Sequence, residues 1–118
     1  MAQQLTLDLR KQVRDYMKLI LDDGKVIEVR KPTKAIFNLF KPLSQAFTDL
    51  KSDDISETES WDLLDTIYEM SSKILSNNRK REDISVAYLE DMLATDDLEA
   101  LFSMYMTFVN GHLEIAKN

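Results

Sequence analysis

The segment Met17 to Phe37, MKLILDDGKVIEVRKPTKAIF, decides the fold of one end of this chain. Two apolar runs flank Asp22-Asp23-Gly24-Lys25, and an Asp-Gly pair supplies the positive φ angles that a tight hairpin turn requires. Proline lacks the amide proton that would continue a strand, and Thr33 can cap a helix that opens after Pro32. We therefore predict a β-hairpin over residues 17–30, followed by helix.

The predicted hairpin has one expected register and one competing interpretation. The turn chemistry favours a register with two apolar pairs and one poor pair: Leu21 with Val26, Ile20 with Ile27, and Leu19 with Glu28. A helix that ends at Gly24 is the alternative, because five apolar residues also share a helical face: Leu9, Val13, Tyr16, Met17 and Ile20. We favour the hairpin because its turn residues fix the pairing.

Leucines alternate with polar residues at the start of the chain, at Leu5, Leu7 and Leu9. This alternation predicts a short strand or an extended arm, which is too short to stand alone. We assign residues 1–16 to an N-terminal arm.

Apolar residues recur at helical spacing after the hairpin, which predicts a helical bundle over residues 33–110. The first stripe is interrupted or kinked at Pro42 and comprises Ile36, Leu39, Phe40, Leu43, Phe47 and Leu50. The second follows the polar loop 51–57, ends at Ser76-Asn77-Asn78, and comprises Trp61, Leu64, Ile67, Tyr68, Ile74 and Leu75.

Two further helices complete the expected bundle. Ser85 can cap a short one whose inward residues are Val86, Leu89, Met92 and Leu93. The last starts near Asp96, with Glu99 in a capping-box position, and Gly111 is its expected stop. Its inward residues are Leu98, Leu101, Phe102, Tyr105 and Val109, and residues 111–118 form a C-terminal tail.

The expected fold is therefore mainly α. It is a compact helical bundle of four to five helices with a small N-terminal β-hairpin. A length of 118 residues fits a single domain over residues 1–118.

The chain is acidic, with 15 lysines and arginines against 21 aspartates and glutamates and a formal net charge of −6. This charge repels phosphate backbones and anionic lipids, so neither nucleic acid nor a membrane is an expected partner. The basic run Asn78-Arg79-Lys80-Arg81 is expected to be a solvated loop, because Glu82-Asp83 offsets it. The absence of cysteine excludes thiol chemistry and fits a reducing cytoplasm. No apolar stretch approaches the ~18 residues that span a bilayer.

No catalytic constellation can be assembled from the sequence, so we expect no enzyme, no cofactor and no metal site. His112 is the only histidine, and a solvated residue after the helix stop is favoured over a base or ligand. The serines at Ser71, Ser72 and Ser76 have no histidine near them in sequence. The paired carboxylates fit turns, helix starts and solvated faces better than a cation site: Asp22-Asp23, Asp53-Asp54, Glu90-Asp91 and Asp96-Asp97.

Surplus apolar residues are the better indication of function. Met104, Phe108 and Ile115 form a stripe on the last helix that is separate from its inward face, while Leu63 and Met70 lie off the stripe of the Trp61 helix. These helices are either central and buried all round, or they present a face to a partner. The five residues are our candidate partner contacts.

The run LILDDGKVIEVRKPTKAIFNLF, residues 19–40, resembles the start of the tail assembly chaperones of long-tailed bacteriophages and prophages of Gram-positive bacteria. Those proteins often begin with a strand, an Asn-Gly or Asp-Gly turn, a second strand and an Arg-Lys-Pro-Thr-like entry into a first helix. Later features are similar in kind: an acidic linker, a helix of the Trp61–Leu75 type and, within Ser85–Val109, an aspartate-rich break before a final aromatic helix. The resemblance covers residues 17–109, and the N-terminal arm and the long polar stretch around Asn77 depart from the pattern.

The resemblance implies a non-catalytic role in virion tail assembly, in the host bacterial cytoplasm. Such chaperones bind the tape measure protein, keep it soluble and help recruit tail tube subunits, so these two proteins are the expected partners. A tape measure protein exposes long amphipathic helices, which spare apolar and methionine surface could cover while the negative charge limits self-association. We expect several copies per partner and a weak homo-oligomer.

A small acidic regulator, antitoxin-like or anti-sigma-like, is the alternative function. It would mask a basic surface on a protein target, and the charge of the chain is its main support. The two hypotheses differ in the effect of salt, because an acidic mask loses affinity steeply with ionic strength and an apolar coat does not.

Overall fold

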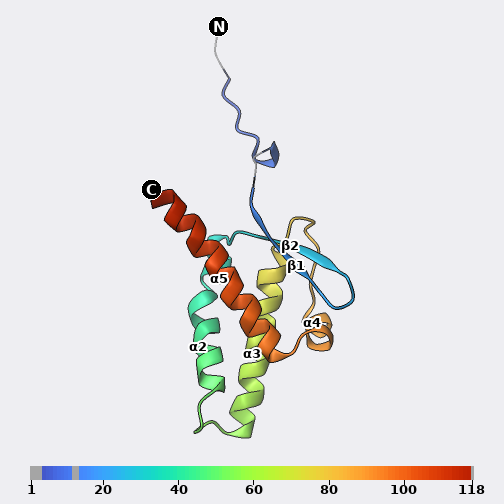
Figure 1. Ribbon diagram of the computed structural model, residues 1–118, viewed down its shortest axis with the longest axis vertical. Helices are drawn as coiled ribbons and strands as arrows, with labels where there is room; N and C mark the ends of the chain where they lie inside the picture. The colour runs from blue at the N-terminus through green and yellow to red at the C-terminus, as the bar shows by residue number, and fades with distance from the viewer. Residues whose placement is uncertain (1–3, 12–13, 118) are drawn as a thin grey trace.

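The computed structural model describes residues 4–11 and 14–117, with side chains for 4–10 and 14–110. This part of the chain is mainly helical and carries a two-stranded antiparallel hairpin near its N-terminal end (Figure 1), so the predicted fold class is confirmed at this level. The elements in chain order are a 3₁₀ turn η1 (Leu9–Lys11), β1 (Tyr16–Ile20), β2 (Val26–Arg30), α1 (Lys34–Phe37), α2 (Phe40–Leu50), α3 (Glu57–Ser76), α4 (Val86–Met92) and α5 (Thr95–Lys117).

The hairpin forms where the sequence predicts it, but the predicted register is wrong by one residue. The opposed pairs are Tyr16–Arg30, Met17–Val29, Lys18–Glu28, Leu19–Ile27 and Ile20–Val26, and not Leu21–Val26 and Ile20–Ile27. The Gly24 amide donates to the Leu21 carbonyl at 2.8 Å, and the Leu21 amide donates to the Lys25 carbonyl at 2.9 Å. Gly24 has a φ of 87°, as in the common hairpin loop of three residues that ends in a left-handed residue. The loop is thus one residue shorter than the predicted register requires.

The observed register gives the hairpin one apolar face. Met17, Leu21, Ile27 and Val29 are buried, while Lys18 lies opposite Glu28 on the other face. The poor pair of the predicted register, Leu19 with Glu28, is thereby replaced by an apolar pair and a pair of opposite charge.

Pro42 lies at the start of a helix and does not kink one. Thr33 caps α1 by accepting a hydrogen bond from the Ile36 amide at 3.3 Å, as predicted. The chain then leaves the helix at Asn38 and re-enters it at Phe40. Pro42 falls in the first turn of α2, where no amide proton is needed, whereas a continuous helix would press its ring against the Asn38 carbonyl.

Of the two caps predicted for the later helices, the one at Ser85 is confirmed, and the structure adds a cap at Ser56 that the sequence analysis did not predict. Ser56 and Ser85 accept hydrogen bonds from the amides at the third residue of α3 and α4, at 3.2 and 3.1 Å. The predicted capping box of Asp96 and Glu99 is wrong, because the Asp97 carboxylate accepts from the amide of Ala94 at 2.9 Å. Glu99 instead pairs with Lys51.

Gly111 does not stop the last helix. The α5 helix continues to Lys117, so the predicted tail over 111–118 is wrong for its described backbone. Glycine in a helix interior costs only about 1 kcal/mol relative to alanine, which flanking helix formers offset. The side chains of His112 and Ile115 lie outside the described residues.

The core lies between the apolar face of the hairpin and the helices α2, α3 and α5, with α3 in contact with α2, α4, α5 and β2. Tyr105 is fully buried, and its hydroxyl donates to the Arg30 carbonyl at 3.0 Å, which ties α5 to the end of β2. Burial raises the pKa of Tyr105 above its usual range. Phe40 packs edge-on against the Tyr105 and Phe102 rings, with centroids 5.6 and 5.9 Å apart, which joins α2 to α5.

The molecule is more extended than a compact domain of its length. Its radius of gyration is 17.2 Å, against about 13 Å for a compact chain of this size. Residues 4–11 and the C-terminal part of α5 both project from the body in Figure 1.

Candidate interaction surface

A hollow of about 300 Å³ lies between β1 and the first turns of α5. The hairpin contributes Leu19, Ile20 and Leu21, and α5 contributes Ala100, Leu101 and Met104. Ile20 is 65% exposed and Met104 is 53% exposed, although both are large apolar side chains. We call this feature the β1–α5 hollow.

The strand beside this hollow has an open edge. The Arg30 amide donates to the Asn77 carbonyl, and the Glu28 carbonyl accepts from the Arg79 amide, each at 2.9 Å, so the outer edge of β2 is covered. In an antiparallel pair of strands, two opposed residues either both direct their backbone N–H and C=O groups toward the partner strand or both direct them outward. Tyr16 and Lys18, which oppose these residues, therefore direct their backbone groups away from β2. Within residues 4–11 and 14–117, no backbone hydrogen bond joins this outer edge of β1 to another segment.

The candidate contacts from the sequence do not form one face. Met104 is exposed beside the β1–α5 hollow, whereas Leu63, Met70 and Phe108 are partly buried against the core. The Lys31 ammonium lies 4.9 Å from the centroid of the Phe108 ring and covers it. Ile115 cannot be placed, since its side chain is outside the described residues.

Leu63 borders a second hollow, of about 400 Å³, between the end of α2 and the start of α3. Four carboxylate residues line it with Leu63: Asp49, Asp54, Glu59 and Asp62. This recess is acidic, and it shares no lining residue with the β1–α5 hollow.

Two large aromatic side chains are exposed: Trp61, which the sequence placed on an apolar stripe of the bundle, and Phe37, to which the sequence analysis assigned no position. Trp61 is 62% exposed and Phe37 is 50% exposed. The fully buried residues of α3 begin only at Ile67, and the start of this helix, including Trp61, is largely exposed. Helical periodicity in the sequence identifies the apolar stripe of a helix, but it does not show how much of that stripe other elements cover.

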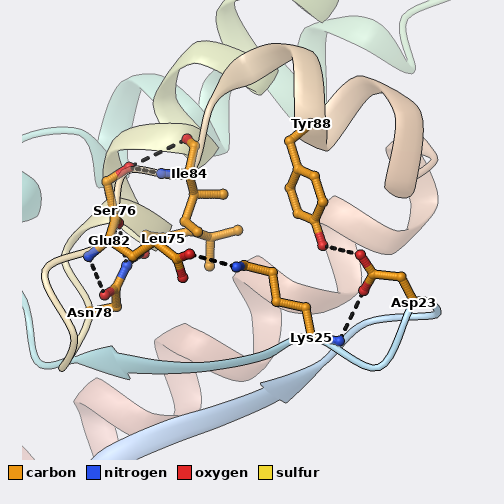
Figure 2. A network of polar contacts seen from close by, with 8 residues as sticks. All are labelled: Asp23, Lys25, Leu75, Ser76, Asn78, Glu82, Ile84 and Tyr88. Atoms are coloured by element: carbon orange, nitrogen blue, oxygen red, sulfur yellow. Dashed lines mark hydrogen bonds and ion pairs between the residues drawn. The ribbon is translucent and has the colours of Figure 1, made fainter.

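A polar network joins the hairpin turn to the loop after α3 (Figure 2). Asn78 is 2% exposed, and its side-chain amide donates to the carbonyls of Leu75 and Glu82 at 2.8 and 2.7 Å. Its side-chain oxygen accepts from the Glu82 amide at 3.0 Å. The prediction of a solvated basic loop is therefore wrong for Asn78, and it holds for Arg79, Lys80 and Arg81, which are exposed.

The other half of the network holds the hairpin turn against α4. The Asp23 carboxylate accepts from the Lys25 amide at 2.9 Å and from the Tyr88 hydroxyl at 2.7 Å, and these bonds, the first above all, lower the pKa of Asp23. Partial burial, with the bond to Asp23, raises the pKa of Tyr88 to about 12. Lys25 pairs with Glu82 at 2.7 Å. These groups satisfy one another, which indicates a structural role.

The described residues hold no group of three or more histidine, cysteine, aspartate or glutamate side chains placed to bind a metal ion. In the part of the chain that the structure describes, no helix is both long and apolar enough to cross a bilayer. Comparison of the chain with protein-family models, with curated proteins and with solved structures gave no match.

Proposed function

We propose that this chain is a non-catalytic tail assembly chaperone of a long-tailed phage or prophage. In this proposal it binds the tape measure protein and keeps it soluble in the host bacterial cytoplasm, and it helps recruit tail tube subunits as a weak homo-oligomer. The family in this proposal rests on the resemblance of residues 17–109. The observation that supports the activity is the set of large apolar side chains left exposed on the helical body, above all Met104 and Trp61.

The exposed residues suit a client made of amphipathic helices. Met104 and Trp61 project from two different helices, so one copy offers separated apolar contacts that a long helix could bridge. Methionine adapts its shape to different partners because its side chain is unbranched. The contacts of α3 with α2, α4 and α5 support the bundle-like body that the proposal assumes.

Co-expression with the tape measure protein of the same phage or prophage tests the proposal. The soluble fraction of the tape measure protein should rise with this chain present, and should fall again with the variant Met104→Glu, which charges an exposed apolar contact. Ser103→Glu is the matched control, because Ser103 is the exposed neighbour of Met104 on α5 and gains the same charge. A tape measure protein that stays insoluble with the unaltered chain would rule out the proposal.

An acidic regulator remains the second candidate, and the carboxylate-lined hollow beside Leu63 favours it. Such a protein would bind a basic surface through Asp49, Asp54, Glu59 and Asp62. Replacement of Asp54 and Glu59 by Asn and Gln should weaken binding to such a target and leave the solubilisation of a helical client unchanged.

A further inference from the structure

We propose that the N-terminal arm of one copy of this chain adds as a strand to the outer edge of β1 in a second copy, with its leucines in the β1–α5 hollow. This inference concerns self-association only and does not rest on the proposed function.

The outer edge of β1 offers the two features that strand addition requires, namely outward backbone groups and an apolar hollow beside them. Lys18 and Tyr16 direct backbone groups outward from an edge to which the described residues make no backbone hydrogen bond. An edge strand with free backbone groups is a template for another extended chain. Leu19 belongs to the apolar face of the hairpin and lines the hollow together with Leu101 of α5. Side chains on one face of an added strand would extend this apolar face and would lie over Leu101.

The donor matches this edge in pattern. Residues 4–8 have no regular secondary structure and leave the body as an extended arm (Figure 1). Leu5 is 93% exposed and Leu7 is 72% exposed, which are the largest exposures among the large apolar side chains that the structure describes. In an extended chain these two leucines share one face, so pairing at the edge would place both in the hollow.

The charges of the arm and of the body are complementary. The first fourteen residues carry three basic side chains and one acidic side chain, whereas the rest of the chain carries twelve basic and twenty acidic ones. Asp22 and Asp97 are among the residues that line the hollow. The basic arm of one copy is thus attracted to the acidic surface of another copy. Repulsion between like charges disfavours contact between the acidic remainders of two copies.

A second copy fits as the occupant better than the same chain does. To reach its own β1 the arm would have to reverse within residues 10–15, where Asp15, next to the strand, is the one residue of a type that favours a tight turn. The Arg14 side chain donates to the Leu9 carbonyl at 3.1 Å, and Asp8 pairs with Arg10 at 2.9 Å. Each copy offers one donor and one acceptor, so exchange gives a reciprocal pair or a head-to-tail chain of copies.

Thiol cross-linking of the full chain without any client tests this proposal, since the chain has no cysteine of its own. Leu7→Cys protein is mixed with Met104→Cys protein of different tag length, and a short bifunctional maleimide is added. We expect at least about tenfold more mixed cross-linked dimer than with Ser103→Cys in place of Met104→Cys, because bound partners reach a high effective concentration. Ser103 is the exposed neighbour of Met104 and lines a different hollow, between α2 and α5.

A block of the strand edge shows whether backbone pairing carries the contact. Lys18→Pro removes an outward amide proton from an edge strand that tolerates proline, so it should lower the mixed product by about tenfold, whereas Lys18→Ala should not. Circular dichroism of both variants checks that the fold is kept. The proposal is overturned if Ser103→Cys cross-links as well as Met104→Cys does, or if Lys18→Pro protein that is folded cross-links like Lys18→Ala. It is also overturned if the double variant with Leu7→Cys and Met104→Cys closes within one chain on dilution.

Discussion

Replacement of Asn78 by alanine should destabilise this protein far more than other changes in the same loop. The side chain makes three hydrogen bonds, to the Leu75 carbonyl and to both backbone groups of Glu82. Alanine removes all three and leaves those backbone groups without their partners. A net hydrogen bond is worth about 1 kcal/mol, and a partner left unsatisfied in a buried place costs about 1–3 kcal/mol. Because Glu82 itself is exposed and water can reach it, we take the lower value for each bond, which gives a loss of about 3 kcal/mol.

Urea unfolding followed by far-ultraviolet circular dichroism measures this loss. For a chain of this length a change of about 3 kcal/mol lowers the melting temperature by roughly 10 °C. Lys80→Ala is the matched control, because Lys80 is exposed in the same loop, and it should stay within about 0.5 kcal/mol of the unaltered protein. Asn78→Asp keeps the size but loses both donors, so it should lose at least as much as alanine does. The reasoning fails if Asn78→Ala unfolds at the same urea concentration as Lys80→Ala.

Three further predictions concern the hairpin and its neighbours. Gly24→Ala should lower the free energy of unfolding by about 1–2 kcal/mol. No atom lies within 4 Å of the added carbon, so the φ of 87° is the whole cause of this loss. Urea unfolding should show a smaller loss for Gly24→Asn, and equal losses would contradict this explanation. Ile27→Ala should cost roughly 3 kcal/mol and Ile20→Ala under about 1 kcal/mol, because only Ile27 is buried, and similar losses would contradict the observed register. The raised pKa of Tyr88, about 12 in the folded protein, means that its neutral form is favoured by folding; stability present below about pH 10 is therefore lost as the pH rises towards about 12, and melting curves of Tyr88→Phe should lack that part of the decline.

Local sequence features predicted the existence of the hairpin and two of the helix starts. These features are the Asp-Gly pair between two apolar runs and the hydroxyls of Thr33 and Ser85. Each affects only residues close to it in the sequence, so its effect can be predicted from the sequence. The register could not be settled this way, because loops of three and four residues both contain Gly24 at an acceptable place. The poor pairing of Leu19 with Glu28 was the one sign in the sequence that the register should move.

The role of Asn78 was hidden because its packing depends on a strand distant in sequence. The residue bridges to Val29 of β2, and the neighbouring Arg79 amide donates to the Glu28 carbonyl. A run of basic residues predicts a solvated loop, and only the tertiary contact shows that its first residue is buried. The same limit explains Trp61, whose exposure depends on how far the core extends along α3.

The sequence showed that α5 carries more apolar residues than its inward face needs. It did not show which of these side chains are exposed and which are covered by other residues. Met104 and Phe108 are four residues apart on one helix, yet Lys31 and the Tyr105 ring cover Phe108 while Met104 faces the β1–α5 hollow. Ile20 was expected to pair with Ile27; in the observed register it pairs with the exposed Val26, and it lines the β1–α5 hollow together with Met104.

The salt dependence of client binding tests the proposed chaperone activity most directly. A helical segment of the tape measure protein is titrated into the purified chain at about 50 mM and about 500 mM sodium chloride, which shortens the range of electrostatic attraction roughly threefold. Trp61 is the only tryptophan and is exposed, so its fluorescence reports the contact. Coverage of apolar helices predicts a Kd that changes by less than about threefold. A loss of affinity of more than about tenfold over this range would contradict the chaperone proposal and favour an acidic mask.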